Sequence, residues 1–375
     1  MLVVFSVLRG KHLGNPCATR FGSLVLYRKQ YQTFRKGMTP SDMQTEIMYY
    51  IGVDLGGTNI AVGIVNTDLQ IIEKGSVPTN AGRDGDAIVK DMADLCLRLL
   101  NKKNIPLSEV AYVGIASPGA INSEAGIVAN ANNLPFDNYP MVKVFSEFSG
   151  IPKVYIANDA NAAALAEAIA GAAKDTKYSV MITLGTGVGG GIVLDGQVYS
   201  GFNAAAGELG HMVIHHNGRQ CSCGRRGCFE AYSSATGLTN MTKEKIEECN
   251  LKGIPTLMND EVAQNGGKVT ARTAFSAMKK GDIKAKEVVD MYIDYLADGL
   301  ASIINIFQPE VLSIGGGVCN EREHLLTPLL ARIENELYTR DFSEKDKTKI
   351  KIAELGNDAG ILGAAVLGLR DLNKA

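Results

Sequence analysis

Residues 49–66 read YYIGVDLGGTNIAVGIVN, and this stretch decides the fold. Apolar residues fill both halves, and the pair Gly56–Gly57 separates them. Because an apolar run, a glycine turn and a second apolar run are typical of a β-hairpin, we expect two antiparallel strands here. Residues 178–201, YSVMITLGTGVGGGIVLDGQVYSG, repeat the plan. Two copies of one plan predict paired lobes with a cleft between them.

Strand and helix patterns alternate outward from these hairpins. We expect strands in residues 111–119, 154–158 and 310–318, and helices in residues 86–102, 143–150, 159–172, 242–284, 294–308 and 359–369. Strands that alternate with helices predict a mixed α/β sheet. We expect a small lobe from residues 48–165 plus 358–375, on which the last helix packs back, and a large lobe from residues 166–357.

Composition excludes some classes of partner. The 375 residues carry 38 Lys and Arg against 40 Asp and Glu, a formal charge of -2, so no basic field can hold nucleic acid or an anionic membrane. No apolar run approaches the roughly 20 residues of a membrane-spanning helix. Three of the seven cysteines fall between residues 221 and 228, which favours a metal site in a reducing compartment over disulfides. We therefore expect a cytoplasmic enzyme with a small-molecule substrate.

Residues 1–47 differ in kind from the rest. Their stretch 9–37 carries seven basic residues and shows neither a helical nor a strand period. A secretory signal would place its apolar core after the charges, whereas MLVVFSVL precedes them. An organellar transit peptide is one interpretation. We favour a disordered or wrongly assigned extension ahead of a start at Met38, Met43 or Met48.

Three glycine loops follow apolar strands, at Asp54–Asn59, Gly185–Gly191 and Gly315–Gly317. Backbone N–H groups reach phosphate oxygens only where side chains do not block them, so three such loops favour a phosphate site. The second loop contains a GxGxxG pattern, but a dinucleotide site requires a helix directly after it, and a hairpin pattern follows instead. No loop ends in Gly-Lys-Ser/Thr, which excludes a Walker A motif.

Asp159 lies where the strand VYIAN passes into an Ala-rich helix. Its sequence position alone allows two roles. An Asp before a helix often caps it. The local sequence favours this cap over the second role, a base that accepts the proton of a hydroxyl during phosphoryl transfer, which a helix N-terminus would keep ionised.

His211, Cys221, Cys223 and Cys228 have the spacing H-x9-C-x-C-x4-C. Three thiolates and one imidazole make a closed tetrahedral Zn²⁺ site, which is structural because no position remains open for water. His215 and His216 compete for the place of the fourth ligand. Arg225 and Arg226 lie inside the loop, and we expect both to face solvent.

In this order the motifs DLGGTN, SPG, NDANAAALAEA, LGTGVGGGIV, GELGHMVI and CSCGRRGCFEAY resemble the ROK family of sugar kinases from about Tyr49 onward. The resemblance implies a two-lobed actin/hexokinase-like α/β ATPase fold with a structural zinc loop. It implies Asp54 near Mg²⁺, Thr58 near the transferred group and His211 as the fourth zinc ligand. The ATP-binding residues that it implies are Asp54, Gly56, Gly57, Thr58, Asn59, Thr186, Gly187, Gly315, Gly316 and Gly317.

The same resemblance implies a sugar pocket with Asp159 as the catalytic base. Its expected substrate-binding residues are Gly119, Asn132, Asn158, Asp159, Glu208, His211 and Glu230. His211 would serve both zinc and a sugar hydroxyl through its two ring nitrogens. Carboxylates that bind hydroxyls also reject analogues lacking them.

The resemblance thus implies an ATP-dependent kinase acting on the 6-hydroxyl of a hexose, with glucose as the first candidate. N-acetylmannosamine, N-acetylglucosamine or fructose are alternatives, because these motifs do not report the substituent at C2. Polyphosphate is an alternative donor. A sugar-responsive repressor is the alternative of another class, although residues 1–47 lack the two helices of a helix-turn-helix. Homodimers or higher homo-oligomers are common in the family.

Overall fold

A computed structural model describes residues 48–131 and 133–372. The expectations for residues 1–47 and for Asn132 lie outside the described residues. Among the helices that are described, none has both the length and the apolar character that a membrane crossing needs.

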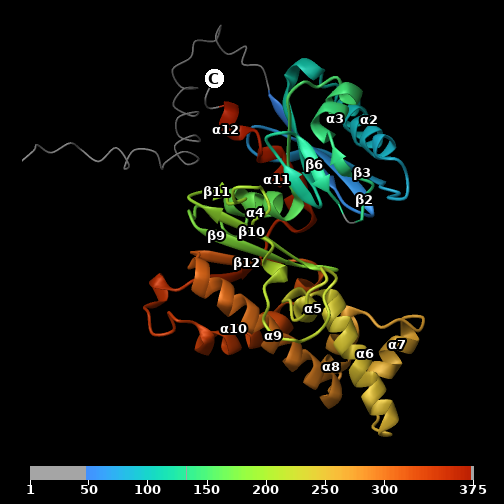
Figure 1. Cartoon of the computed structure of the whole chain (residues 1–375), viewed down its shortest axis with the longest axis vertical. Coiled ribbons are helices and arrows are strands. Elements are labelled where there is room, and N and C mark those ends of the chain that lie inside the picture. The colour runs from blue at the N-terminus through green and yellow to red at the C-terminus, as the bar shows by residue number, and fades with distance from the viewer. Residues whose placement is uncertain (1–47, 132, 373–375) are drawn as a thin grey trace, which may run out of the picture. The chain divides into compact units, whose positions relative to one another are not determined.

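Two five-stranded sheets share one strand order. Figure 1 shows parts of both sheets. In each sheet three antiparallel strands are followed by two parallel ones. The first sheet runs β3 (Ile71–Pro78), β2 (Asn59–Val65), β1 (Tyr49–Leu55), β4 (Val110–Ser117) and β8 (Val154–Asn158). The second runs β11 (Gln197–Val198), β10 (Val188–Leu194), β9 (Ser179–Leu184), β12 (Val311–Gly315) and β13 (Lys349–Ile352). Both predicted hairpins, β1–β2 and β9–β10, are confirmed.

The alternation of side chains in β1 places Asp54. Ile51, Val53 and Leu55 lie in the core cluster that includes α2 (Gly85–Lys103). The intervening residues of β1 face α11 (Ala359–Val366), which is the predicted small-residue helix. A side chain at Gly52 would overlap the carbonyl of Ile361, so the glycine lets the helix approach closely. Asp54 thus faces the first turn of α11, at Gly360.

Helix α4 (Asp159–Ala170) covers one face of the second sheet, where Met181 and Val193 pack against its alanines. The other face carries the larger core, against α9 (Ile283–Phe307) and α10 (Glu323–Ile333). Helices α4 and α11 also pack against each other. The start of α4, where Asp159 lies, is therefore fixed by both sheets.

The remaining elements complete the two halves. A small sheet of β5 (Ala120–Asn122), β6 (Ile127–Asn130) and β7 (Asp137–Tyr139) lies beside α3 (Met141–Ser149). The other helices are α5 (Glu230–Ser233), α6 (Ala235–Leu251), α7 (Met258–Gln264), α8 (Ala271–Lys279) and α12 (Leu369–Leu372).

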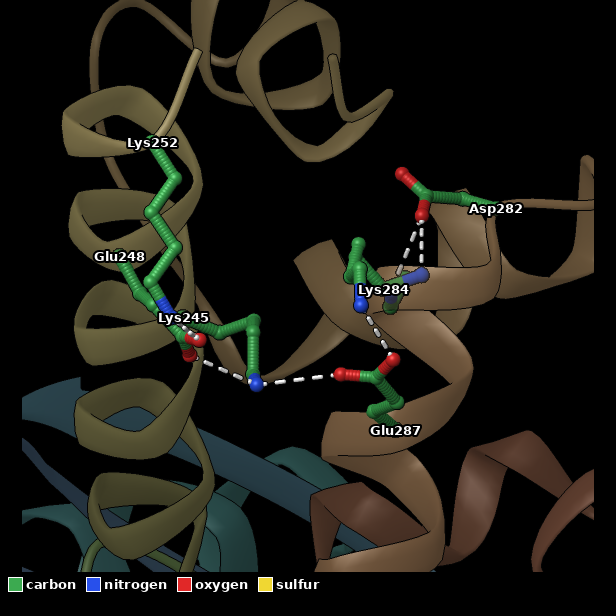
Figure 2. Close-up of polar contacts among 7 residues, drawn as sticks. Lys245, Glu248, Lys252, Asp282, Lys284 and Glu287 are labelled. Atoms are coloured by element: carbon green, nitrogen blue, oxygen red, sulfur yellow. Dashed lines mark hydrogen bonds and ion pairs between the residues drawn. The ribbon is translucent and has the colours of Figure 1, made fainter. Parts of the chain in front are cut away.

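Polar contacts join α6 to α9 (Figure 2). Lys245 of α6 lies between two carboxylates, 2.8 Å from Glu248 and 3.1 Å from Glu287. Asp282 caps α9 through the N–H groups of Lys284 and Ala285 and also accepts the N–H of Leu257 before α7. These contacts hold α6, α7 and α9 together, so α6, which follows the cysteine loop, is held against α9.

Three expectations need correction. The strand β3 was not predicted, because its sequence IIEKGSVP has no regular alternation of apolar and polar residues and contains Gly75 and Pro78. The helical stretch expected at residues 242–284 consists of the end of α6, α7, α8 and the start of α9, and the helix expected at residues 294–308 begins at Ile283. Gly253 and Pro255 lie between α6 and α7. Gly266 and Gly267, with φ angles of 63° and 78°, lie between α7 and α8 and end the helix before them.

Candidate active site

Asp159 is the first residue of α4, and Asn158 caps the helix. The Oδ1 atom of Asn158 accepts the backbone N–H groups of Ala160 at 3.0 Å and Asn161 at 3.2 Å. The capping interpretation of Asp159 is therefore wrong, because its neighbour already satisfies these donors. Asp159 Oδ1 shares the Ala160 N–H at 2.8 Å. The Asn158 side chain and the backbone N–H of Asp159 also interact with this carboxylate.

Asp54 and Asp159 form a pair of desolvated carboxylates. Burial, and then the charge of Asp159, raise the pKa of Asp54 to about 6. Burial also raises the pKa of Asp159, although the Ala160 N–H opposes the rise. Burial thus outweighs the helix N-terminus, contrary to the expectation from sequence. Within residues 48–131 and 133–372, no Lys or Arg forms an ion pair with either carboxylate. Such a pair suits a divalent cation or a proton in transfer.

The first glycine turn connects β1 to β2. The Gly56 N–H donates to the Asn59 carbonyl at 2.9 Å, and the hydroxyl of Thr79 donates to the Gly56 carbonyl at 2.6 Å. No atom lies within 4 Å of the place that a side chain at Gly57 would take, and Thr58 is exposed. The backbone of Gly57 and Thr58 can therefore meet a ligand directly.

The second glycine turn, Gly185–Gly187, is held by residues that follow the cysteine loop. Glu230 Oε2 accepts the N–H of Val188 at 3.0 Å. The Thr236 hydroxyl donates to the Thr186 carbonyl at 2.7 Å, and the Ala235 N–H donates to the Gly185 carbonyl at 2.9 Å. Strand β10 follows this turn, so the helix that a dinucleotide site requires is absent there.

The third turn lies beside the second. Gly315 ends β12 opposite Thr183 of β9, and a side chain at Gly316 would overlap the carbonyl of Leu184. Gly317 begins a short 3-10 helix, η3 (Gly317–Glu321), and no atom lies within 4 Å of the place that its side chain would take. Two of the three predicted phosphate loops are thus neighbours at one end of the second sheet.

The structure brings His211, Cys221, Cys223 and Cys228 together, with their ligand atoms within 4.8 Å of one another. Cys221 Sγ lies 3.7 Å from His211 Nδ1, and Cys223 Sγ lies 3.7 Å from Cys228 Sγ. A tetrahedron with zinc–sulfur bonds of about 2.3 Å has edges of about 3.8 Å, so both separations fit zinc. Burial raises the pKa of Cys228 to about 12, and a bound cation would lower it by stabilising the thiolate.

His211 points Nδ1 at this cluster, which leaves Nε2 for another partner. His215 instead stacks on Tyr232, with ring centroids 5.9 Å apart, and does not belong to the ligand group. Arg225 and Arg226 are exposed, as expected, and Arg225 donates to the His211 carbonyl at 3.3 Å.

The predicted sugar residues fall into two groups. Asn158 Nδ2 donates to the Gly119 carbonyl at 3.1 Å, which ties the Pro-Gly turn to the start of α4. Glu208 is exposed and directly precedes the 3-10 helix η2 (Leu209–His211), whose last residue belongs to the His/Cys cluster. Glu230 accepts hydrogen bonds through both carboxylate oxygens, because its Oε1 atom also accepts the Ser222 hydroxyl at 3.1 Å.

Residues 50–371 match the ROK family. The chain belongs to the ROK family. A glucokinase from Halalkalibacterium halodurans is 36% identical over 320 residues, which are 85% of this chain and 94% of that protein. Among solved structures, a ROK family glucokinase from Streptomyces griseus in complex with glucose and AMPPNP has a TM-score of 0.72 at 28% identity, covering 86% of this chain and 99% of that one.

Other ROK relatives carry other names. An N-acetylmannosamine kinase from Citrobacter koseri is 32% identical, covering 86% of this chain and all of that protein. A xylose repressor from Caldicellulosiruptor bescii is 27% identical, covering 92% of this chain and 84% of that one. The structural relatives include ROK sugar kinases, and the predicted actin/hexokinase-like fold is confirmed.

Several residues at this ROK site were not found from sequence. Ser222 and Thr236 hold Glu230 and the second turn, and Gly360 leaves room for the Asp54 carboxylate, which a side chain there would overlap. The serine between two cysteine ligands could have been noticed. The other two give no local pattern.

Proposed function

We propose that this ROK protein transfers the γ-phosphate of ATP to the 6-hydroxyl of glucose, with Asp159 as the general base. The observation that carries the proposal is the pair of buried carboxylates formed by Asp54 near the end of β1 and Asp159 at the start of α4. Family membership supports a sugar as the acceptor. The relatives named glucokinase support glucose among sugars.

Asp159 would accept the proton of the 6-hydroxyl as the phosphoryl group is transferred. Phosphoryl transfer needs positioning, charge neutralisation and a carboxylate for the proton rather than covalent help from the protein. Oδ1 of Asp159 is held by the Ala160 N–H, which orients the carboxylate. The raised pKa of Asp159 makes it a better proton acceptor than an ordinary aspartate.

The three glycine turns would hold the nucleotide. The open backbone at Gly57 and Thr58 suits phosphate oxygens, and Gly56 and Asn59 shape this turn. Thr186 and Gly187 would contact phosphate from the second turn, and Gly315–Gly317 would lie near the adenosine. Asp54 would hold Mg²⁺, which supplies charge neutralisation on the triphosphate. Polyphosphate remains the alternative donor.

The cysteine cluster would hold structural Zn²⁺ through His211, Cys221, Cys223 and Cys228. The sulfur and nitrogen separations support zinc, as does the donor set of three thiols and one imidazole. Four protein ligands leave no position for water. The metal would therefore fix the loop and take no part in the reaction.

The sugar pocket would be formed by Gly119, Asn132, Asn158, Asp159, Glu208, His211 and Glu230. The Asn158–Gly119 bond supports one side of this pocket. On the other side, His211 would bind a sugar hydroxyl through Nε2, because Nδ1 faces the metal cluster. We also propose a homodimer or higher homo-oligomer.

N-acetylmannosamine is the second candidate substrate, which the relative of that name favours at 32% identity. N-acetylglucosamine and fructose differ from glucose at positions that the motifs do not report. A sugar-responsive repressor is the alternative of another class, supported by the named xylose repressors. A base at Asp159 favours the kinase.

A panel of sugars in an assay that couples ADP release to NADH oxidation tests the proposal. We expect glucose to have the highest kcat/KM, with glucose 6-phosphate as the product. Preference for N-acetylmannosamine would replace glucose but retain the kinase. If no sugar in the panel leads to ADP release and the protein binds DNA in a salt-dependent way, the repressor is favoured.

A further inference from the structure

Asn161 lies in the first turn of α4, two residues after Asp159, and carries a hydrogen-bond acceptor without a donor. The residue is 6% exposed, and its Oδ1 atom is buried with no partner. Leaving a buried amide oxygen unpaired is unfavourable, so native proteins pair nearly all such atoms. An unpaired one beside the proposed base calls for a donor that another state of the protein supplies.

Gly207, which borders two candidate donors, lies close to this atom. Asn161 Oδ1 is 3.5 Å from the place that a side chain at Gly207 would take. The backbone N–H groups of Gly207 and Glu208 donate to no acceptor in the described ranges 48–131 and 133–372. Gly207 has a φ of 94°, which glycine adopts freely, so the peptide that follows it can turn.

Both partners rest on the same strand. A side chain at Gly191 of β10 would contact the Asn161 Cα atom at 3.3 Å, and one at Gly190 would meet the Gly207 carbonyl at 2.8 Å. The first turn of α4 and the segment before Glu208 therefore pack side by side on β10. A small rotation of one peptide, rather than a movement of either element, would bring a donor to Oδ1.

We propose that Asn161 is a positioning residue for the sugar site, whose Oδ1 atom accepts the backbone N–H of Glu208 when the sugar is bound. The bond joins the segment that carries Glu208 to the helical turn that carries Asp159. The sugar itself does not touch Oδ1, because that atom is buried. The inference rests on the proposed hexose kinase function and adds the element that sets Glu208 against the base.

This role predicts that substitution of Asn161 changes sugar affinity without reducing stability, unlike substitution of a residue that only packs. In the ligand-free protein the amide oxygen is a cost, so its removal should not reduce stability. In the sugar complex it is a partner, so its removal should weaken binding. A purely structural asparagine would show loss of stability and unchanged sugar affinity.

The test is Asn161→Leu, which keeps the approximate volume and removes the acceptor. We expect the Tm of the ligand-free protein to be equal or higher, and the Kd for glucose, measured by calorimetry, to rise about tenfold. The KM for ATP should stay within a factor of two. Thr339→Val is the matched control, because Thr339 is 3% exposed with an unpaired buried hydroxyl. That variant should leave the glucose Kd unchanged.

An unchanged glucose Kd in Asn161→Leu, with or without a lower Tm, would overturn the inference. If the leucine variant does not fold, Asn161→Ala gives the same test through the glucose Kd, and an unchanged value again overturns it. Wild-type protein that binds and phosphorylates no hexose would reject the proposed function itself. Failure of the inference alone is recognised by an active wild type and a variant of equal glucose affinity.

Discussion

The two hairpin turns occupy equivalent places in sheets of the same strand order, yet different parts of the chain hold them. The first turn, Asp54–Asn59, is fastened by Thr79 of its own sheet region and is open beside Gly57. The second turn, Gly185–Gly187, is fastened by the carboxylate of Glu230 and by residues at the start of α6. Glu230 in turn accepts the hydroxyl of Ser222 in the cysteine loop.

This difference assigns the reaction to the first turn and structural dependence on the cysteine loop to the second. The first turn follows the carboxylate of Asp54 and needs nothing from the cysteine loop. The second carries no acidic residue, and its shape depends on a loop that four metal-type ligands close. Disturbing the cysteine loop should therefore affect the second turn, whereas changing Asp54 should affect the reaction and leave the second turn intact.

Removing a ligand of the proposed metal should have the largest effect, on zinc content and on stability. Cys228→Ser removes one ligand, and we expect bound zinc to fall from about one per chain to near zero. The free energy of unfolding should drop by about 3 kcal/mol or more, because a structural metal contributes its binding energy to folding. Metal analysis and thermal denaturation measure both. Cys249→Ser, at a buried cysteine outside the cluster, should keep the metal. Equal zinc content in both variants would contradict the assignment.

Asp54→Asn should come next, with kcat lower by about 100-fold or more, because a cation ligand beside the base is lost. The ligand-free protein should nevertheless be more stable at pH 7.5. Burial raises the pKa of Asp54 to about 6, so the favourable protonated form is present at low pH and lost as the pH rises through 6.

Thermal denaturation at two pH values tests this sign. Asn mimics the protonated carboxyl, so the gain should be on the order of 2 kcal/mol at pH 7.5 and should vanish near pH 4. A variant that is less stable than wild type at pH 7.5 would show that the Asp54 carboxylate has a stabilising partner.

Glu230→Ala should have a smaller effect, confined to substrate binding. Without the bond to the Val188 N–H the second turn loosens, and we expect the KM for ATP to rise about tenfold, or about 1.4 kcal/mol. Ser222→Ala is the matched control, since it removes only the link to the cysteine loop and should raise this KM by less than about threefold. An unchanged KM for ATP in Glu230→Ala would mean that the second turn stands without the carboxylate.

The sequence was sufficient for features with a local pattern. Both hairpins, a helix that begins at Ala359 and the grouping of three cysteines with a nearby histidine follow from apolar periodicity and ligand spacing, and the structure confirms them. His211 was selected over His215 only through the family resemblance. Local sequence does not report which of several histidines a loop turns inward.

The remaining features depend on tertiary contacts. Asn158 and Asp159 are adjacent and both can cap a helix, so only the folded backbone decides that Asn158 does so. The raised pKa values of Asp54 and Asp159 come from burial between elements far apart in sequence. The bond from Val188 to Glu230 spans 42 positions, and no spacing rule predicts it. The roles of the sugar and ATP residues stay predictions.

Asp159→Asn tests the central claim most directly, with glucose phosphorylation and glucose binding measured on the same preparation. Asparagine keeps the size of the side chain and its bond to the Ala160 N–H, but it cannot accept the hydroxyl proton. We predict that phosphorylation falls below detection while the Kd for glucose stays within about threefold of wild type. Turnover close to that of wild type would contradict the assignment of Asp159 as the base.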